Sequence, residues 1–300
     1  MRLLVTGGSG YLGAGILKRA PKTWQIAATY FAHPIASVHR LGDEESRSST
    51  PTGERLRQRK GNVAAFRVDV RDADAVDCLF DEFQPDVVIH TVAQMTGDQM
   101  MSVNVDGARN IARAVARANA RLIHLSSDVI FDGEHAPYTE RAAPDPISPY
   151  AESKARAESA VKEELPRAVI ARTSLIYGLD PLDPRTRQVL NGEMPCLFTD
   201  EYRCPIFVDD LVDALLELAE IEFAGVINIA GAQRLSRCDF GARMANAFHA
   251  APRFEPALSA SYPGRRPRDC TLDISLAQKV LRTRLRGVDE VVANIKRINE

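Results

Sequence analysis

The stretch RLLVTGGSGYLG, residues 2–13, joins a short apolar run to glycines at positions 7, 10 and 13. The apolar run predicts a buried strand, and the residues after it predict a helix that Pro21 ends. Glycines between a strand and a helix are typical of a dinucleotide-binding turn. Gly7 would permit the tight bend, Gly10 the approach of a pyrophosphate, and Gly13 close packing of the helix. An ordinary strand-to-helix turn is the alternative.

The first turn of this predicted helix includes Tyr11 and Leu12. The unbonded N–H groups at a helix start, and the positive end of the helix dipole, favour a bound phosphate. We therefore expect Tyr11 and Leu12 to belong to a cofactor-binding site.

A second apolar run, residues 26–30, predicts the next strand and ends at Tyr30. Dinucleotide folds selective for NAD usually place an acid after this strand, where it binds the ribose hydroxyls. The residues that follow here, FAH at 31–33, include no Asp or Glu. The sequence therefore favours NADP, with His33 or Arg40 near the 2′-phosphate, and leaves NAD possible. The alternative is that His33 only caps a loop.

Four further apolar runs predict strands, at residues 65–68, 86–90, 122–125 and 167–172. Strands that alternate with helices and are mostly apolar throughout indicate a parallel sheet covered on both faces. The sequence thus predicts an α/β fold, a Rossmann-type doubly wound parallel sheet over residues 1–175. Residues 176–300 are expected to form mainly a small substrate-binding lobe, with some segments returning to the sheet. The polar stretch 41–62 predicts a mobile loop.

Two of the predicted strands end in residues suited to a cofactor. Asp69 and Val70 follow the strand predicted at 65–68, and an acid there is well placed to meet an adenine edge. Ala93 follows the strand predicted at 86–90, and its small side chain would let the backbone lie against a cofactor. Alternatively, Asp69 or Asp72 caps the helix that runs to Phe83.

A second informative stretch runs from SSD at 126–128 to YAESK at 150–154. A helix is predicted from Ser148, so Tyr150 and Lys154, four residues apart, share one of its faces. A lysine ammonium one turn away is expected to lower the tyrosine pKa from about 10, which makes the phenol a usable general acid or base. Ser127 would then hold a substrate carbonyl oxygen. A surface helix with an incidental Tyr and Lys is the alternative.

Composition narrows the class of protein. Three hundred residues with 45% hydrophobic content allow a sizeable core, and a net charge of -2 gives no general attraction to nucleic acid or a membrane. The five cysteines never form Cys-x-x-Cys, which argues against disulfides or a metal site. We expect no signal peptide and no membrane span, and therefore a cytoplasmic protein.

A basic cluster, RRPR at residues 265–268, lies in the predicted lobe. Solvated surface charge is the ordinary interpretation, but a substrate that carries a diphosphate would suit it. We expect Arg265 and Arg268, together with Asp128 and Arg203, to contact substrate.

These motifs resemble the extended short-chain dehydrogenase/reductases, and within that superfamily most of all the dTDP-4-dehydrorhamnose reductases and their relatives. The resemblance spans nearly the whole chain. It is carried by TGGSGYLG at 6–13, NVDG at 104–107, SSDVIFDG at 126–133, PYTE at 137–140, Tyr150 with Lys154, RTSLIYG at 172–178, VDDL at 208–211 and RPRDCTLD at 266–273.

The resemblance implies an NADPH-dependent reductase of a nucleotide-linked 4-keto sugar. Tyr150 would be the catalytic acid, Lys154 its pKa-lowering and ribose-binding partner, and Ser127 the hydroxyl that orients the carbonyl. Ser127 stands where the family pattern has Thr, and Val129 where it often has an aromatic residue, so the sugar stays open. A homodimer is also left open.

Two alternatives come from the same superfamily. The subgroup also resembles the regulatory β subunit of methionine adenosyltransferase, which binds NADP and serves as a partner protein. An epimerase or dehydratase would retain NAD, and the missing acid after Tyr30 argues against it.

Overall fold

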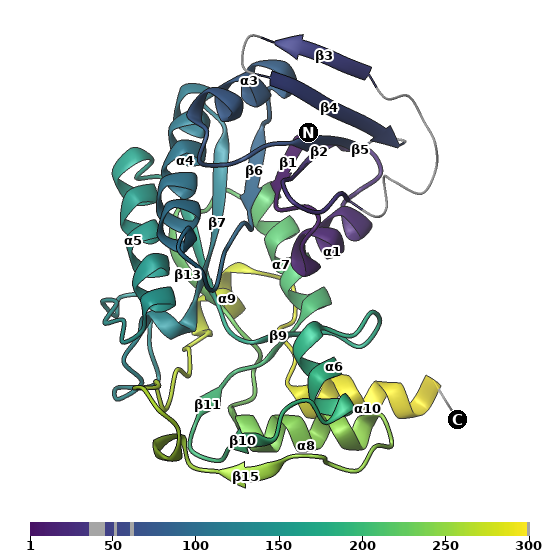
Figure 1. The fold of residues 1–300 in the computed structure, drawn as a ribbon, viewed down its shortest axis with the longest axis vertical. Coiled ribbons are helices and arrows are strands. Elements are labelled where there is room, and N and C mark those ends of the chain that lie inside the picture. The colour runs from purple at the N-terminus through teal and green to yellow at the C-terminus, as the bar shows by residue number, and fades with distance from the viewer. Residues whose placement is uncertain (36–45, 51–52, 61–62, 299–300) are drawn as a thin grey trace. The chain divides into compact units, whose positions relative to one another are not determined.

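A computed structural model describes residues 1–35, 46–50, 53–60 and 63–298 (Figure 1). The chain divides into two compact units. The first comprises Met1–Leu125, Ser153–Ile170 and Leu215–Gly225. The second comprises Ser126–Glu152, Ala171–Ala214 and Val226–Glu300. The boundary predicted near residue 175 stays a prediction.

The described residues form one central sheet of nine strands, in the order β13-β8-β7-β6-β1-β2-β5-β4-β3. Its strands are β1 (Arg2–Thr6), β2 (Gln25–Tyr30), β3 (Ser46–Thr50), β4 (Gly53–Lys60), β5 (Val63–Arg67), β6 (Val87–His90), β7 (Arg121–Ser127), β8 (Val169–Thr173) and β13 (Gly225–Ile229). β7, β6, β1, β2 and β5 pair in parallel, as the runs of apolar residues predicted. The predicted Rossmann-type sheet is confirmed.

Helices follow the strands in the expected alternation. The longer ones are α1 (Tyr11–Arg19), α3 (Ala73–Phe83), α4 (Gly107–Arg117), α5 (Pro149–Glu164), α6 (Pro184–Asn191), α7 (Val208–Glu220), α8 (Arg237–Ala247), α9 (Ser275–Val280) and α10 (Val288–Ile298). Short turns are the π-helical η1 (Ser102–Asp106) and the 3-10 turns η2 (Asp128–Ile130) and η3 (Ser259–Ser261). In the part of the chain that the structure describes, none of the helices combines the length and apolar character that crossing a membrane requires.

The core of the first unit is packed around β1. Leu3, Leu4 and Val5 have no solvent-exposed surface, and burying each such side chain stabilises the fold by roughly 1.5–3 kcal/mol. Figure 1 shows α1 on one side of β1 and the pair α3 and α4 on the other, so that the sheet is covered on both faces. This arrangement leaves the carboxyl ends of the strands as the open edge, where α/β folds bind ligands.

The predicted loop at 41–62 is wrong over the residues that the structure describes. Strands β3 and β4 form an antiparallel hairpin, and β4 pairs with β5, so the hairpin extends the sheet. A polar edge hairpin needs no alternation of apolar residues, because its backbone hydrogen bonds to the exposed edge of β5 stabilise it. Residues 41–45, 51–52 and 61–62 of the predicted loop lie outside the described residues.

The second unit contains short strand pairs: β9 (Ile176–Tyr177) with β12 (Ile206–Phe207), β10 (Cys196–Phe198) with β15 (Glu255–Ala257), and β11 (Tyr202–Arg203) with β14 (Leu235–Ser236). Its apolar core surrounds the fully buried Tyr177 and includes Phe240, Met244 and Val288. The Tyr177 ring contacts Phe240 with centroids 5.4 Å apart. These short elements therefore pack as a unit with a core of its own.

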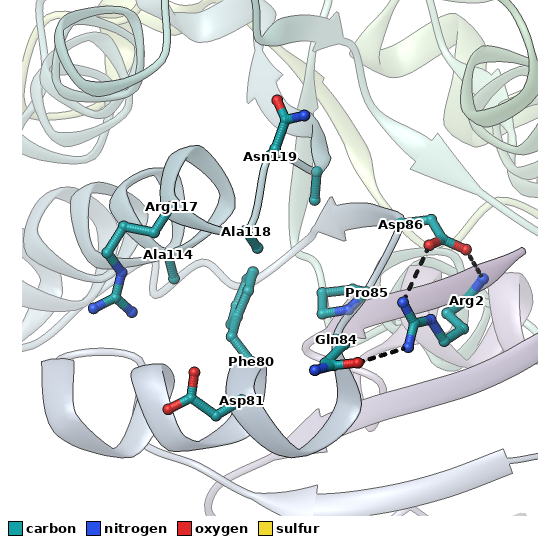
Figure 2. Close-up of a pocket in the computed structure, with 11 residues that line it drawn as sticks. Arg2, Phe80, Asp81, Gln84, Pro85, Asp86, Ala114, Arg117, Ala118 and Asn119 are labelled. Carbon is teal, nitrogen blue, oxygen red and sulfur yellow. Dashed lines mark hydrogen bonds and ion pairs between the residues drawn. The ribbon is translucent and has the colours of Figure 1, made fainter.

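A pocket of about 610 Å³ opens in the first unit where β1 and β6 begin (Figure 2). Three of its polar residues bond to one another: the Arg2 backbone N–H donates to Asp86 at 2.6 Å, and the Arg2 guanidinium donates to Gln84 at 3.2 Å. None of the predicted site residues lines it. Because ligands of this fold class bind at the carboxyl ends of the strands, we do not assign this pocket to the functional site.

Candidate functional site

The glycine-rich turn follows β1 as predicted. Gly7 adopts φ +77°, a conformation that side chains other than glycine's rarely allow. Its N–H donates to the Thr29 hydroxyl at 3.2 Å, and the Gly10 N–H donates to the Gly7 carbonyl at 2.9 Å. These bonds fix the turn that leads into α1.

Gly13 fills the structural role that its spacing predicts. A Cβ atom there would lie 2.2 Å from the Gly7 carbonyl oxygen, so only glycine lets α1 pack this closely on the turn. Helix α1 begins at Gly10 with no side-chain cap and has no acid in its first turn, which includes Tyr11 and Leu12. The first N–H groups of a helix have no partner within the helix, so a helix start of this kind suits a phosphate.

The segment after β6 lies against this turn. The Thr91 hydroxyl donates to the Thr6 carbonyl at 2.7 Å, and a Cβ on Gly7 would come within 2.9 Å of that hydroxyl. Ala93, two residues further on, is exposed. The structure thus brings the glycine-rich turn and the segment that contains Ala93 together in the first unit.

At the end of β2, Tyr30 is buried and the Phe31 ring is 48% exposed. The Arg67 guanidinium lies 5.5 Å from the Phe31 ring centroid and donates to the Phe31 carbonyl at 3.3 Å. Sequence analysis missed Arg67, a cation at the strand end where an acid is absent. His33 is exposed, and Arg40 lies outside the described residues.

Asp69 has a partner that the sequence did not predict. Arg71 donates to its carboxylate through the backbone N–H at 3.0 Å and the guanidinium at 2.5 Å, and these bonds lower the Asp69 pKa. Asp72, not Asp69, caps α3 by accepting from the Ala75 N–H at 3.0 Å. Val70 is buried, against Gly107.

Asn104 organises the loop that follows β6. Its side chain accepts from the Gln94 N–H at 2.7 Å and donates to the Gln94 carbonyl at 2.8 Å and the Ser153 hydroxyl at 2.8 Å. Asn104 lies in η1, the π-helical turn that leads into α4. The motif residue therefore ties the candidate cofactor loop to the residue before Lys154.

Lys154 is buried in the first unit. Its ammonium donates to the Leu125 carbonyl at 2.7 Å, and burial lowers the Lys154 pKa to about 8. The buried rings of His90 and His124 stack with centroids 5.3 Å apart. Burial, and secondarily the Lys154 charge, lowers the pKa of His90 to about 3 and that of His124 well below its ordinary value. Both imidazoles are therefore neutral at physiological pH.

Ser127 is the last residue of β7 and Asp128 is the first residue of η2, and both belong to the second unit. The Ser127 hydroxyl donates to the Asp128 carboxylate at 3.3 Å and accepts from the Val129 N–H at 3.4 Å. Asp128 is buried, accepts from the Ser174 hydroxyl at 2.6 Å and lies 3.8 Å from the Arg203 Nε. Burial raises the Asp128 pKa.

Tyr150 lies in the first turn of α5, which Ser148 caps by accepting from the Ala151 N–H at 3.3 Å. The predicted lowering of the Tyr150 pKa is wrong. Burial first, and the Asp128 charge second, raise it to about 12. Desolvation disfavours the phenolate, so the tyrosine stays protonated at neutral pH.

The predicted basic cluster divides into paired and exposed residues. Arg266 forms an ion pair with the buried Glu201. Arg203 donates to the carbonyl oxygens of its neighbour Tyr202 at 2.7 Å and of Pro267 at 3.2 Å. Arg265 and Arg268 are exposed. Their predicted contacts with substrate stay predictions.

Several of the motif residues hold the second unit together instead of forming a site. The Tyr138 hydroxyl donates to Asp132 at 2.5 Å, and its ring stacks on Phe131 with centroids 4.0 Å apart. The buried Arg172 lies 5.2 Å from the Phe131 ring. Asp210 accepts from the Arg286 N–H at 2.9 Å. These contacts explain why long motifs extend beyond the candidate site.

Two arginines that sequence analysis missed, Arg185 and Arg237, lie near Arg203 and Arg266 in the second unit. Within the described residues, neither guanidinium has a hydrogen bond or ion pair. A signal was present in the sequence: both cations occupy the first turn of a helix, where acids are normally favoured.

The first unit fits a dinucleotide. Its parallel sheet ends in a turn that admits no side chain at Gly7 or Gly13, and the helix start beyond that turn has no capping side chain. These features, with Tyr150 and Lys154 on α5, define a dinucleotide-binding protein of the extended short-chain dehydrogenase/reductase class. The chain belongs to the RmlD substrate binding domain family, whose model matches residues 1–298.

Relatives of this chain include a subunit of a methionine adenosyltransferase and a reductase. Methionine adenosyltransferase 2 subunit beta of Rattus norvegicus is 26% identical over 298 residues, which cover 91% of this chain and 80% of the relative. A dTDP-4-dehydrorhamnose reductase of Aggregatibacter actinomycetemcomitans is 27% identical over 237 residues, which cover 71% of this chain and 81% of the relative.

Solved structures support the fold. The crystal structure of dTDP-4-dehydrorhamnose reductase from Bacillus anthracis in complex with NADP aligns with a TM-score of 0.78 at 20% identity. The alignment covers 100% of this chain and 99% of that one. At this level of identity, the similarity confirms the architecture.

Proposed function

We propose that this protein is an NADPH-dependent reductase of a nucleotide-linked 4-keto sugar, with NAD as a possible second cofactor. The observation that carries the proposal is the spacing of Tyr150 and Lys154 on α5, with the lysine ammonium buried. The reductase relative and the NADP complex of a structural neighbour support it.

The proposed cofactor contacts come from the first unit. The turn at Gly7, Gly10 and Gly13 and the N–H groups that start α1 would hold the pyrophosphate. Arg67 would meet the 2′-phosphate end, and Lys154 the nicotinamide ribose. A bound NADPH would supply the hydride for reduction of the carbonyl.

The proposed proton comes from Tyr150. Its phenol would donate to the alkoxide that develops at the keto oxygen, and the Ser127 hydroxyl would hydrogen-bond the same oxygen. The raised Tyr150 pKa, about 12, suits this role, because a protonated phenol is needed and an alkoxide is more basic than a phenolate. The protonated tyrosine is the form that can donate a proton during reduction.

The test is turnover with defined substrates. The purified protein would be incubated with NADPH and a panel of nucleotide-linked 4-keto sugars, and NADPH absorbance would be followed. We expect oxidation of NADPH with at least one dTDP- or UDP-linked 4-keto sugar. Absence of turnover with every member of the panel, for a protein that binds NADPH, would contradict the proposal.

A second candidate function is that of a regulatory subunit, like the β subunit of methionine adenosyltransferase. The alignment with methionine adenosyltransferase 2 subunit beta of Rattus norvegicus covers 91% of this chain. A regulator would bind NADP and a synthetase partner but reduce no sugar. Partner binding would then be unchanged in a Tyr150→Phe variant. Co-purification of the synthetase with both native and variant protein would support this alternative.

We also propose that the protein is cytoplasmic, that it forms a homodimer, and that residues 176–300 form mainly a substrate-binding lobe. Light scattering after size exclusion would test the oligomeric state. A monomer at micromolar concentration would contradict the homodimer and leave the reductase assignment intact.

A further inference from the structure

The pocket of about 610 Å³ in the first unit lies where helices α3 and α4 end (Figure 2). Its volume is within the range of small-molecule sites, about 300–1,000 Å³. Gln84 caps the end of α3 with φ 50°, and Asn119, just beyond the end of α4, has φ 49°. Both residues line the pocket, so the carboxyl-terminal ends of two helices border it.

Apolar side chains form one part of the pocket wall. These residues belong to α3, to α4 and to the segments that follow the two helices. They are buried in the first unit: Phe80, Pro85, Ala114 and Ala120. The wall can therefore cover the apolar part of a ligand, and the ring of Phe80 adds an aromatic surface.

The charged residues that line the pocket are paired, with one exception. Arg2 forms an ion pair with Asp86 at 3.5 Å, and the Arg117 guanidinium donates to Asp77 at 2.7 Å. Within the described residues, the Asp81 carboxylate has neither a hydrogen bond nor an ion pair. The unpaired charge among the described lining residues is therefore negative.

Asp81 occupies an unfavourable position in α3. It belongs to the last turn of the helix, where the helix dipole is negative and where no basic residue occurs. Helix α4 differs, because Arg117 lies in its last turn. A cation bound beside Asp81 would oppose both the carboxylate charge and the negative end of α3. Binding thus explains an acid that helix stability does not favour.

We propose that this pocket binds a small organic cation with an apolar stem, of the class of the primary alkylammonium ions. The ammonium would lie beside Asp81 and the end of α3, and the stem against Phe80 and Pro85. An aromatic ring also attracts a cation that lies over its face. No residue assigned above to the cofactor or the substrate lines this pocket, so the inference is independent of the proposed function.

Hexylammonium is the probe, and NMR titration of the full chain is the measurement. The backbone amide signals of Asp81, Ala118 and Asn119 should shift saturably as hexylammonium is added. Hexanol has the same stem without the charge and should bind about fivefold more weakly. Hexanoate, which carries the opposite charge, should not bind.

Variants separate the charge from the shape of the pocket. Asp81→Asn should weaken hexylammonium binding by about fivefold, to the level of hexanol, and should leave hexanol binding unchanged. Glu82→Gln makes the same change at the next residue, which does not line the pocket, and should bind hexylammonium as the native protein does. Ala118→Leu should weaken binding of both compounds, because the larger side chain fills part of the pocket. Ala116→Leu, at an exposed position outside the pocket on the same helix, should not.

Several results would overturn the inference. Equal affinities for hexylammonium and hexanol, or unchanged hexylammonium affinity in Asp81→Asn, would remove the selectivity for a cation. A lower melting temperature in Asp81→Asn would show that the carboxylate is bonded within the protein, since loss of an acid from a helix end should not destabilise it. Tighter binding of Nα-acetyl-lysine amide than of hexylammonium would identify a lysine of a partner protein as the occupant, instead of a small molecule.

Discussion

The candidate phosphate sites of the two units are built by opposite means. In the first unit, backbone N–H groups converge on a turn where Gly13 leaves no room for a side chain, and no cation is needed. In the second unit, the exposed guanidiniums of Arg265 and Arg268 would supply the expected contacts with a substrate diphosphate. The first site minimises side chains, and the second concentrates charged ones.

This difference determines what each site costs the fold. A glycine turn loses conformational entropy but introduces no charge. A cluster of arginines must overcome mutual repulsion, and it retains that cost until an anion binds. A substitution in one unit should therefore change the ligand binding of that unit and leave the ligand binding of the other unchanged. The substitutions below test this from the largest expected effect to the smallest.

The largest effect should follow Tyr150→Phe, which removes one hydroxyl from the second unit. Turnover should fall by about 10²–10⁴-fold, because the phenol is the proposed general acid. NADPH binding by the first unit should survive, as measured by fluorescence titration. Tyr262→Phe, at an exposed tyrosine of the same unit, is the matched control and should retain activity. Full activity in Tyr150→Phe would contradict the assignment of the general acid to Tyr150 in the second unit.

Gly13→Ala should act on the first unit alone. Its Cβ would lie 2.2 Å from the Gly7 carbonyl, so α1 must shift, at a cost of about 1–3 kcal/mol in unfolding free energy. NADPH binding should be lost while dTDP binding by the second unit persists. Ser9→Ala in the same turn adds no atoms and serves as control. Loss of both ligands in Gly13→Ala would show that the two sites are not separable.

The two units should also differ in how their basic side chains respond to acid. The His124 pKa is lowered, so below about pH 6.5 the unfolded chain binds a proton that the folded chain refuses. The contribution of His124 to the free energy of unfolding is therefore complete above about pH 6.5. It is lost as pH falls, by about 1.4 kcal/mol per pH unit for one group. His124→Leu should reduce the dependence of the unfolding free energy on pH below about pH 6.5, by at most that amount per pH unit.

Urea denaturation at several pH values measures this slope. His33→Leu, at an exposed position, is the matched control. An unchanged slope in His124→Leu would mean that His124 is not held neutral by burial. The arginine cluster should show no such dependence between pH 4.5 and 8, since arginine stays charged throughout.

The smallest effect should come from Ala32→Asp, beside the exposed end of β2. A carboxylate there should repel a 2′-phosphate and weaken NADPH binding by about tenfold, while NADH binding holds or improves. Ala32→Asn tests the same position without the charge. Tighter binding of NADH than NADPH by the native protein would contradict the preference inferred from the missing acid.

The features that could be predicted from the sequence are those fixed by neighbours along the chain. The strand, turn and helix at residues 2–19 follow from local spacing, and Ser148 caps its helix as its position suggests. The parallel sheet follows from the alternation of apolar runs with helices. Each of these depends on residues within a few positions of one another.

The missed features depend on tertiary structure. Arg185 and Arg237 approach each other only because α6 packs on α8, and no short motif contains both. The hairpin of β3 and β4 is stabilised by the edge of β5, not by an apolar pattern of its own. The prediction that Lys154 lowers the Tyr150 pKa was wrong for the same reason. Burial and the charge of Asp128, which is distant in sequence, raise this pKa despite the lysine one turn away.

The stacked pair of His90 and His124 gives this protein an internal spectroscopic reporter. Because both rings stay neutral, their proton resonances should hold constant across the pH range in which exposed imidazoles move. Any change in those two signals on adding a nucleotide would therefore arise from the environment of the neighbouring Lys154 and not from titration. Cofactor arrival could then be followed by NMR in native protein, with no label and no substrate.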